Sequence, residues 1–278
     1  MPELPEVETI VRGLRACVIG RSVTGVQVLR QDVIRGYTPE FEEALIGHKV
    51  EEVLRRGKNI IIKLDGGLAM VVHLKMTGQF TCNRPEEEIL KHTHLLINLS
   101  DGGQLRFRDV RRFGYVILVK LDLLTELPQL AAMGPEPLEI TFEDFACRFR
   151  GRRQCIKAML LNQRVVAGLG NIYADEALHR AGIHPETPAD QLSEHNLRHL
   201  FEAVREVLSE AIARRGSSIE NYVDAGGAAG TFQLYHRVYR KRGQPCPLCG
   251  TPIERITVGG RGTHFCPKCQ KRSAGLQR

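Results

Sequence analysis

The sequence predicts an α+β protein of more than one domain: an antiparallel β-sandwich preceded by a short helix, then a helical region ending in a cysteine-rich, strand-like tail. Three observations predict this fold class. The chain has 278 residues, which is about twice the length of a typical domain. Short strand-like runs occupy its first half, and helical periodicity appears in its second half. The excess positive charge also lies entirely in the second half.

Four runs rich in β-branched and aliphatic residues predict the strands. No helical period separates these runs, which is typical of an antiparallel sandwich or barrel. Two Asp-Gly-Gly sequences, at 65–67 and 101–103, are hairpin turn signals. A short helix is expected before the strands, because Pro5 suits a first helical turn and Glu6 suits the positive end of the helix dipole. The predicted strands are 59–64, 68–74, 95–99 and 115–119.

Residues 133–138 contain Pro and Gly and mark the expected domain boundary. Two short helices flank the tight turn at 168–170, which predicts some form of helix-turn-helix arrangement. Residues 217–230 are rich in small side chains without an apolar period, so we expect a mobile loop there. The expected helices begin at Ile156, span 172–181 with Asn171 as N-cap, and span 197–213.

The charge distribution favours a polyanionic partner. Residues 1–150 carry a net charge of −1 and residues 151–278 a net charge of +8, and 235–272 contain nine basic residues and one acid. Nucleic acid is the leading candidate, and a merely solubilising surface is the alternative. No apolar run approaches the roughly 18 residues of a membrane span. The acidic N-terminus predicts no secretion signal, so the cysteines are expected to be metal ligands or reduced thiols.

Two C-x2-C pairs, separated by 16 residues, predict a zinc site. Each pair can form a tight knuckle, and the two together complete a tetrahedron with no open position, so the zinc would be structural. A redox or disulfide role is the alternative, and His264 is not needed as a ligand. The predicted ligands are Cys246, Cys249, Cys266 and Cys269. The other four, Cys17, Cys82, Cys147 and Cys155, lack such spacing and are expected to be ordinary thiols.

Two further features point to chemistry on a phosphate-bearing substrate. Arg261 lies among glycines between the two cysteine pairs, where it could grip a phosphate or be a solvated turn residue. Pro2 follows Met1 in a context that favours removal of the initiator methionine, which would leave a free secondary amine beside Glu3. An α-amino group has a pKa of roughly 7.7–8.0, so part of it is neutral and nucleophilic at physiological pH. Attack of a secondary amine on a carbonyl-like carbon yields an iminium.

These features occur together with a series of motifs that resembles bacterial formamidopyrimidine-DNA glycosylase, also called 8-oxoguanine DNA glycosylase. The motifs run in order along nearly the whole chain. They are residues 2–9, 55–58, 73–76, 109–114, 134–138 and 168–173, followed by the four-cysteine ribbon with Arg261. The resemblance implies a bifunctional DNA glycosylase and AP lyase with a helix-two-turn-helix domain and a zinc-ribbon hairpin, and no organic cofactor.

The resemblance also implies roles for individual residues. Pro2 would attack C1′ and form the Schiff base, and Glu3 would be the acid for sugar opening and base departure. Lys58 would supply a cation and proton donor for β-elimination, and Arg261 would assist δ-elimination. Met76, Arg111 and Phe113 would fill the void left by the flipped base, although without the family Met76 and Phe113 would be interpreted as core. The implied DNA contacts are His92, Arg152 and Asn171, with His73 supporting the site.

The implied partner is double-stranded DNA with an oxidised purine opposite cytosine, bound by a monomer in the bacterial cytoplasm, with no membrane. The implied domains are 1–132 (catalytic sandwich), 133–150 (linker), 151–235 (DNA-binding, with the lesion loop) and 236–278 (zinc hairpin). Three alternatives stay open: an endonuclease VIII-like glycosylase for oxidised pyrimidines, a non-catalytic damage-binding protein, and a plain zinc-ribbon nucleic-acid binder. Leu4 and the void-filling set favour the oxidised-purine branch.

Overall fold

The computed structural model describes residues 2–219 and 221–272. Within it the chain forms two compact units. The first contains the residues up to 132 together with 212–233, and the second contains 133–211 together with the residues from 234 onward. The segment 212–233 therefore packs with the N-terminal sheets, although it follows the helical region in sequence.

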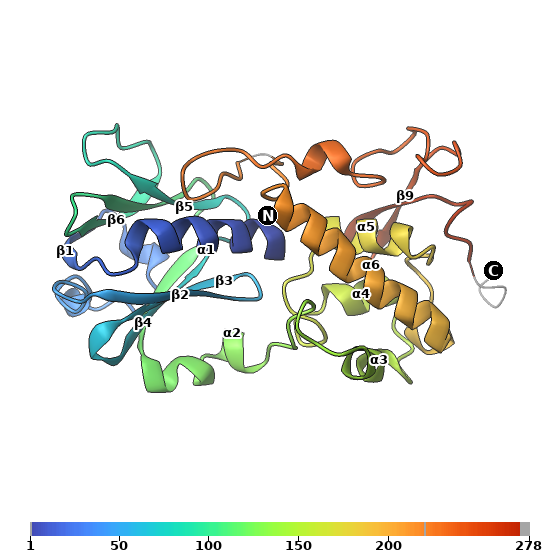
Figure 1. Cartoon of the computed structure of the whole chain (residues 1–278), viewed down its shortest axis with the longest axis horizontal. Helices are drawn as coiled ribbons and strands as arrows, with labels where there is room; N and C mark the ends of the chain where they lie inside the picture. Colours follow the sequence, from blue (N-terminus) through green and yellow to red (C-terminus); the bar gives the residue numbers. More distant parts are fainter. Residues whose placement is uncertain (1, 220, 273–278) are drawn as a thin grey trace. The chain divides into compact units, whose positions relative to one another are not determined.

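The first unit contains the expected antiparallel sandwich of two sheets (Figure 1). One sheet has the strand order β2-β3-β4-β8 and the other β1-β6-β7-β5, and every pairing is antiparallel. The four predicted strands are confirmed as β3, β4, β6 and β8, and the other four strands were not predicted. The strands are β1 (Val23–Val28), β2 (Val50–Arg56), β3 (Asn59–Leu64), β4 (Leu68–His73), β5 (Gly78–Asn83), β6 (Thr93–Leu99), β7 (Gln104–Asp109) and β8 (Tyr115–Lys120).

Helix α1 (Leu4–Val18) precedes the strands and has Pro5 in its first turn. With 15 residues it is longer than the short helix that was predicted. Its apolar face, including Val7, Ile10 and Leu14, is buried in the same core cluster as inward-facing residues of both sheets. The helix packs against β2 and β3 of one sheet and β5 of the other. Because α1 starts directly after Glu3, this packing fixes the position of the chain's second and third residues within the first unit.

The second unit is helical and ends in a β-hairpin. Its helices are α3 (Phe142–Phe149), α4 (Ile156–Leu161), α5 (Asn171–Arg180) and most of α6 (Glu194–Ala213), and its hairpin strands are β9 (Glu254–Val258) and β10 (Arg261–Phe265). The short helix α2 (Pro128–Ala131) closes the first unit. Within the described ranges, no helix is both long enough and apolar enough to cross a membrane.

Three helix boundaries differ from the prediction: α5 begins at Asn171 and ends at Arg180, and α6 begins at Glu194. Asn171 is the first helical residue of α5, and the N-cap is Gly170, whose backbone is extended (φ −135°, ψ −159°). The Asn171 side chain is engaged elsewhere: its Nδ2 donates to the Gly262 carbonyl at 2.8 Å. A tertiary contact thus replaces the local capping bond that the residue type favours.

Candidate active site and zinc site

The start of α1 is held by a buried carboxylate. Glu6 is 1% exposed, and its Oε2 accepts the backbone N–H of Glu3 at 2.8 Å. Its Oε1 accepts the backbone N–H of Ser217 at 2.7 Å. Pro2 and Glu3 are themselves buried, and Glu3 is only 2% exposed. One carboxylate therefore connects the backbone beside the candidate nucleophile to the beginning of the 217–230 loop, and no sequence motif predicts this connection.

Lys58 lies in the tight turn between β2 and β3, where Arg56 and Asn59 are paired. Gly57 precedes it with φ +56°, a conformation that glycine adopts at little cost. Lys58 is 7% exposed, which is unusual for a lysine. The first unit thus buries Pro2, Glu3 and Lys58, and burial of titratable groups is typical of acid–base sites. Their common location in one unit is what the predicted chemistry requires.

His73, at the end of β4, is a neutral side chain close to Lys58. Burial and the positive charges of Lys75, Lys58 and Arg35 lower the pKa of His73 to about 3. Its Nδ1 faces the Lys75 backbone N–H at 3.0 Å, so Nδ1 is the acceptor and Nε2 carries the proton. His73 is therefore a hydrogen-bond donor at neutral pH, in agreement with a supporting role.

The three predicted void-filling residues come together on the surface of the first unit. Arg111 Nη1 lies 3.1 Å from Met76 Sδ, and its guanidinium carbon lies 4.7 Å from the centre of the Phe113 ring. Met76 is 37% exposed and Phe113 is 52% exposed. The core interpretation that their residue types favour is therefore wrong, and the interpretation from the family resemblance matches their exposure.

Asp109 explains why these residues meet. This fully buried carboxylate accepts the Thr77 hydroxyl and the backbone N–H groups of Arg111 (3.1 Å) and Gly114 (2.7 Å). It thereby fixes the loop after β7 beside the residue that follows Met76. The sequence analysis included Asp109 in a motif without assigning it this function.

Backbone strain concentrates near the same loop. Lys75, His92 and Arg112 have φ values of +50°, +71° and +57°, which are uncommon for residues other than glycine. Lys75 directly precedes Met76, and Arg112 lies between Arg111 and Phe113. The His92 carbonyl accepts the Asp109 backbone N–H at 3.0 Å, so the predicted DNA contact His92 belongs to the same structured region. Strained backbone of this kind is often found at ligand-binding positions.

The 217–230 loop is attached to α1 and β5. The Ser217 backbone N–H donates to Glu6 of α1, Gln79 Nε2 donates to the Asn221 carbonyl, and the Cys82 backbone N–H donates to the Ala225 carbonyl at 2.8 Å. The Tyr222 hydroxyl donates to the Arg215 carbonyl at 3.1 Å, in the turn after α6.

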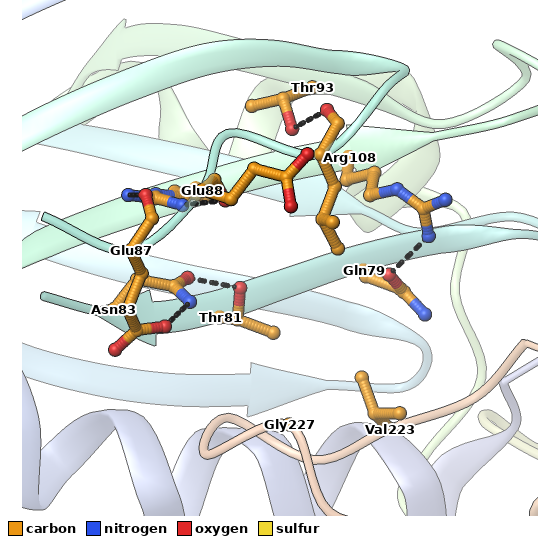
Figure 2. Close-up of a pocket in the computed structure, with 11 residues that line it drawn as sticks. Gln79, Thr81, Asn83, Glu87, Glu88, Thr93, Arg108, Val223 and Gly227 are labelled. Atoms are coloured by element: carbon orange, nitrogen blue, oxygen red, sulfur yellow. Dashed lines mark hydrogen bonds between the residues drawn. The ribbon is translucent and has the colours of Figure 1, made fainter. Parts of the chain in front are cut away.

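A cavity of about 360 Å³ is lined by this loop, by β5 and β7, and by the segment 87–93. Figure 2 shows Gln79, Thr81 and Asn83 on the strand, with Val223 and Gly227 on the loop. Arg108, which donates to Gln79 Oε1 at 3.0 Å, lines the same cavity. The face of β5 next to the loop is therefore polar and open.

In the second unit, Arg261 is exposed at the first position of β10, after Gly259 and Gly260 with φ +56° and +74°. The Asn171 bond to Gly262 places two predicted phosphate-binding residues next to each other. Arg152 is exposed in the turn after α3, and its carbonyl accepts the Asp190 backbone N–H at 2.9 Å.

A buried ion pair behind the hairpin was not predicted. Lys157 Nζ lies 2.6 Å from Asp175 Oδ1, and both side chains are fully buried. Lys157 also donates to Thr263 Oγ1 at 2.7 Å, and Asp175 Oδ2 accepts the His264 backbone N–H at 2.9 Å. The pair joins α4 and α5 to β10, and so supports the strand that carries Arg261. It also explains His264, whose Nδ1 faces Asp175 at 3.3 Å rather than the cysteine cluster.

The four predicted cysteines form one cluster, with their sulfurs within 4.8 Å of one another. The Sγ atoms of Cys246 and Cys269 are 3.9 Å apart, and those of Cys249 and Cys266 are 3.4 Å apart. Tetrahedral thiolates at the usual Zn–S distance of about 2.3 Å are separated by about 3.8 Å. The cluster therefore fits one structural zinc ion. His179 Nε2 lies 3.4 Å from Cys246 Sγ and orients this ligand, an outer contact that the cysteine spacing did not reveal.

The sandwich with buried Pro2 and Glu3, and the helical unit with a four-cysteine hairpin, define a class of two-unit zinc-finger protein. Three family models match in this order. The formamidopyrimidine-DNA glycosylase N-terminal domain matches residues 1–116, its H2TH domain matches 133–223, and the zinc finger found in FPG and IleRS matches 243–272. The chain belongs to the formamidopyrimidine-DNA glycosylase family. It is a base-excision enzyme for oxidised purines with the AP lyase activity of that family.

Relatives of known name agree with this assignment over the full length. The formamidopyrimidine-DNA glycosylase of Bacillus subtilis is 44% identical over 277 residues, covering 98% of this chain and 100% of the relative. That of Desulforamulus reducens is 46% identical, with coverage of 98% and 99%. Among solved structures, Lactococcus lactis Fpg in complex with DNA containing an abasic site has a TM-score of 0.91 and 36% identity, covering 97% of this chain and all of that one. A structure of MutM with DNA containing carbocyclic 8-oxo-G has a TM-score of 0.90 and 37% identity, covering 98% of this chain and all of that one.

Proposed function

We propose that Pro2, Glu3, Lys58 and Arg261 carry out base excision and strand cleavage in this chain. The observation that carries the proposal is the burial of Glu3 and Lys58, at 2% and 7% exposure, in the unit that contains Pro2. Buried titratable groups that lie together in one unit are typical of acid–base sites. The fixed start of α1 presents Pro2 in one orientation, because Glu6 holds the Glu3 backbone.

The chemistry follows from the residue types. Removal of Met1 leaves the Pro2 secondary amine, which attacks C1′ of the flipped nucleotide as the bond to the base breaks. Glu3 gives a proton to the ring oxygen, so the sugar opens and an iminium joins Pro2 to C1′. Loss of a C2′ proton then expels the 3′ phosphate with Lys58 as cation and proton donor, and a second elimination, assisted by Arg261, expels the 5′ phosphate. Hydrolysis of the iminium frees Pro2 and leaves a gap with phosphate on both ends.

The substrate proposed for this chain is 8-oxoguanine or a formamidopyrimidine opposite cytosine in duplex DNA. The support is the exposed group Met76, Arg111 and Phe113, because a thioether and a phenyl ring can occupy a vacated stack while a guanidinium pairs with the orphaned base. His92, Arg152 and Asn171 are proposed as backbone contacts. The enzyme is proposed to act as a monomer in the bacterial cytoplasm. Its named relatives are bacterial proteins.

Borohydride trapping on a duplex with 8-oxoguanine opposite cytosine tests the proposal. Peptide mapping is expected to place the crosslink on an N-terminal Pro2. Glu3→Gln is expected to bind the duplex normally and release the base at least about 100-fold more slowly, since a positioned acid contributes about that much. Glu51→Gln, at an exposed position of β2, is the matched control and should excise the base like the parent chain. Intact DNA binding with no crosslink, in protein shown to lack Met1, would overturn the assignment of Pro2, and a duplex with an oxidised pyrimidine would then test the endonuclease VIII-like alternative.

A further inference from the structure

Two cysteines outside the zinc cluster meet between α1 and β5. Cys17 lies in the last turn of α1 and Cys82 lies near the end of β5. Both are half-buried and pack against the edge of the first unit's core. The two cysteines line the same small cavity, so their thiols lie close together although 64 residues separate them in sequence.

The strand geometry directs Cys82 toward the helix. Gln79, Thr81 and Asn83 are drawn lining the cavity on the outer face of β5 (Figure 2). Neighbouring side chains of a strand alternate between its two faces, so Cys82 lies on the opposite side from Thr81. That side is where α1 packs.

The thiol pair is reachable by a small molecule. Cys17 and Cys82 both line a separate cavity of about 260 Å³, which Arg21 and Gln104 also border. A peroxide is far smaller than this volume. Two cations, Arg21 and Arg84, line the cavity, and Arg21 is paired with Asp101 at 3.1 Å.

We propose that Cys17 and Cys82 form a peroxide-reactive dithiol that closes to an intramolecular disulfide. Burial, together with the hydrogen bond and charge of Cys17, raises the pKa of Cys82, so Cys17 is the thiol that reacts first. Its thiolate attacks one peroxide oxygen, the O–O bond breaks, and the departing hydroxide (or alkoxide) takes up a proton, which leaves a sulfenic acid. The Cys82 sulfur then attacks the Cys17 sulfur, and its proton leaves with the displaced hydroxide as water. Two thiols are oxidised, and one hydrogen peroxide is reduced to two waters.

The disulfide would tie two elements that bear on the site. Helix α1 begins after Glu3, and the Cys82 backbone N–H holds the Ala225 carbonyl of the 217–230 loop. A crosslink that closes a long loop stabilises the folded state chiefly by restricting the unfolded chain. We therefore expect oxidation to raise the midpoint of thermal unfolding by about 5 °C or more, and to slow exchange of the Cys82 amide, which donates to Ala225.

The test is mild hydrogen peroxide treatment of the zinc-loaded, full-length protein, followed by trypsin under non-reducing conditions. The expected product joins the peptides 16–21 and 76–91, because Pro85 prevents cleavage after Arg84. Its mass is lower by two hydrogen atoms than the sum of the two peptides, and a thiol reductant separates them. Zinc release is measured in parallel with a chromogenic chelator. Cys17→Ser is expected to abolish the product, and Cys147→Ser, which removes an exposed cysteine, is the matched control and should give the product as the parent does.

A second measurement uses the unmodified protein alone and so does not depend on how Cys17→Ser folds. In the reduced parent chain, iodoacetamide is expected to alkylate Cys17 faster than Cys82. The proposal is overturned if peroxide releases zinc without forming the disulfide-linked product of peptides 16–21 and 76–91, or if Cys82 is alkylated first. These readouts do not involve DNA, so they are independent of whether Pro2 is the nucleophile.

Discussion

The buried pair Lys157–Asp175 gives a sharp prediction about stability. Lys157→Met keeps the length and apolar volume of the side chain. It leaves the fully buried Asp175 carboxylate without the lysine charge that balances it. Removing one partner of a buried ion pair typically costs about 3–5 kcal/mol. The loss of the 2.7 Å bond to Thr263 is part of this cost. We expect Lys157→Met to lower the free energy of unfolding by about 3–5 kcal/mol.

The assay is urea unfolding of the zinc-loaded protein, followed by circular dichroism, where such a loss lowers the midpoint by about 1–2 M. Lys63→Met is the matched control, because the Lys63–Glu52 pair has a similar N–O distance of 2.7 Å but is 29% and 48% exposed. Solvent screens exposed pairs, so this change should cost about 0–1 kcal/mol.

A double variant separates charge burial from packing. Asp175→Asn, added to Lys157→Met, removes the buried charge and keeps an oxygen that can accept the His264 backbone N–H. We expect it to recover part of the lost stability. The reasoning is refuted if Lys157→Met costs no more than Lys63→Met, or if the added Asp175→Asn makes the loss larger.

Three further predictions concern pH, the void-filling group and the metal. Between about pH 3 and 6.5 the unfolded chain binds a proton at His73 that the folded chain does not, so stability falls as pH drops through this window, by up to about 1.4 kcal/mol per pH unit. His73→Asn keeps an acceptor for the Lys75 N–H. It should make the free energy of unfolding, measured from pH 7 to 4, depend less steeply on pH. An unchanged pH dependence would contradict the assignment of this effect to His73. Phe113→Ala should change stability by no more than about 0.5 kcal/mol, because the ring is exposed, while slowing excision of 8-oxoguanine from duplex DNA; equal excision rates would remove Phe113 from the void-filling set. Cys249→Ser should lose zinc, measured by metal analysis, and weaken DNA binding while the far-UV signal of the sandwich persists; unchanged DNA binding would contradict a structural zinc.

The sequence by itself determined the features whose information is local. The zinc ligands were identified because a C-x2-C knuckle is defined by four consecutive residues, and the structure places all four sulfurs within 4.8 Å. The strand 59–64 was predicted with its observed bounds, since its residues are apolar and β-branched and the Asp-Gly-Gly turn follows. The strands β5 and β7 were missed because polar side chains such as Gln79 and Arg108 alternate with their buried residues.

Only the tertiary structure decided what depends on contacts between distant segments. The residue types of Met76 and Phe113 favoured core positions, and their exposure follows from Asp109, which fixes two loops far apart in sequence. Cys17 and Cys82 had no metal spacing and were expected to be ordinary thiols, and the packing of α1 on β5 is what makes them a pair. The geometry of a short motif depends on a few backbone dihedral angles within it. Contact between two side chains that are distant in sequence depends on how the sheets and helices pack.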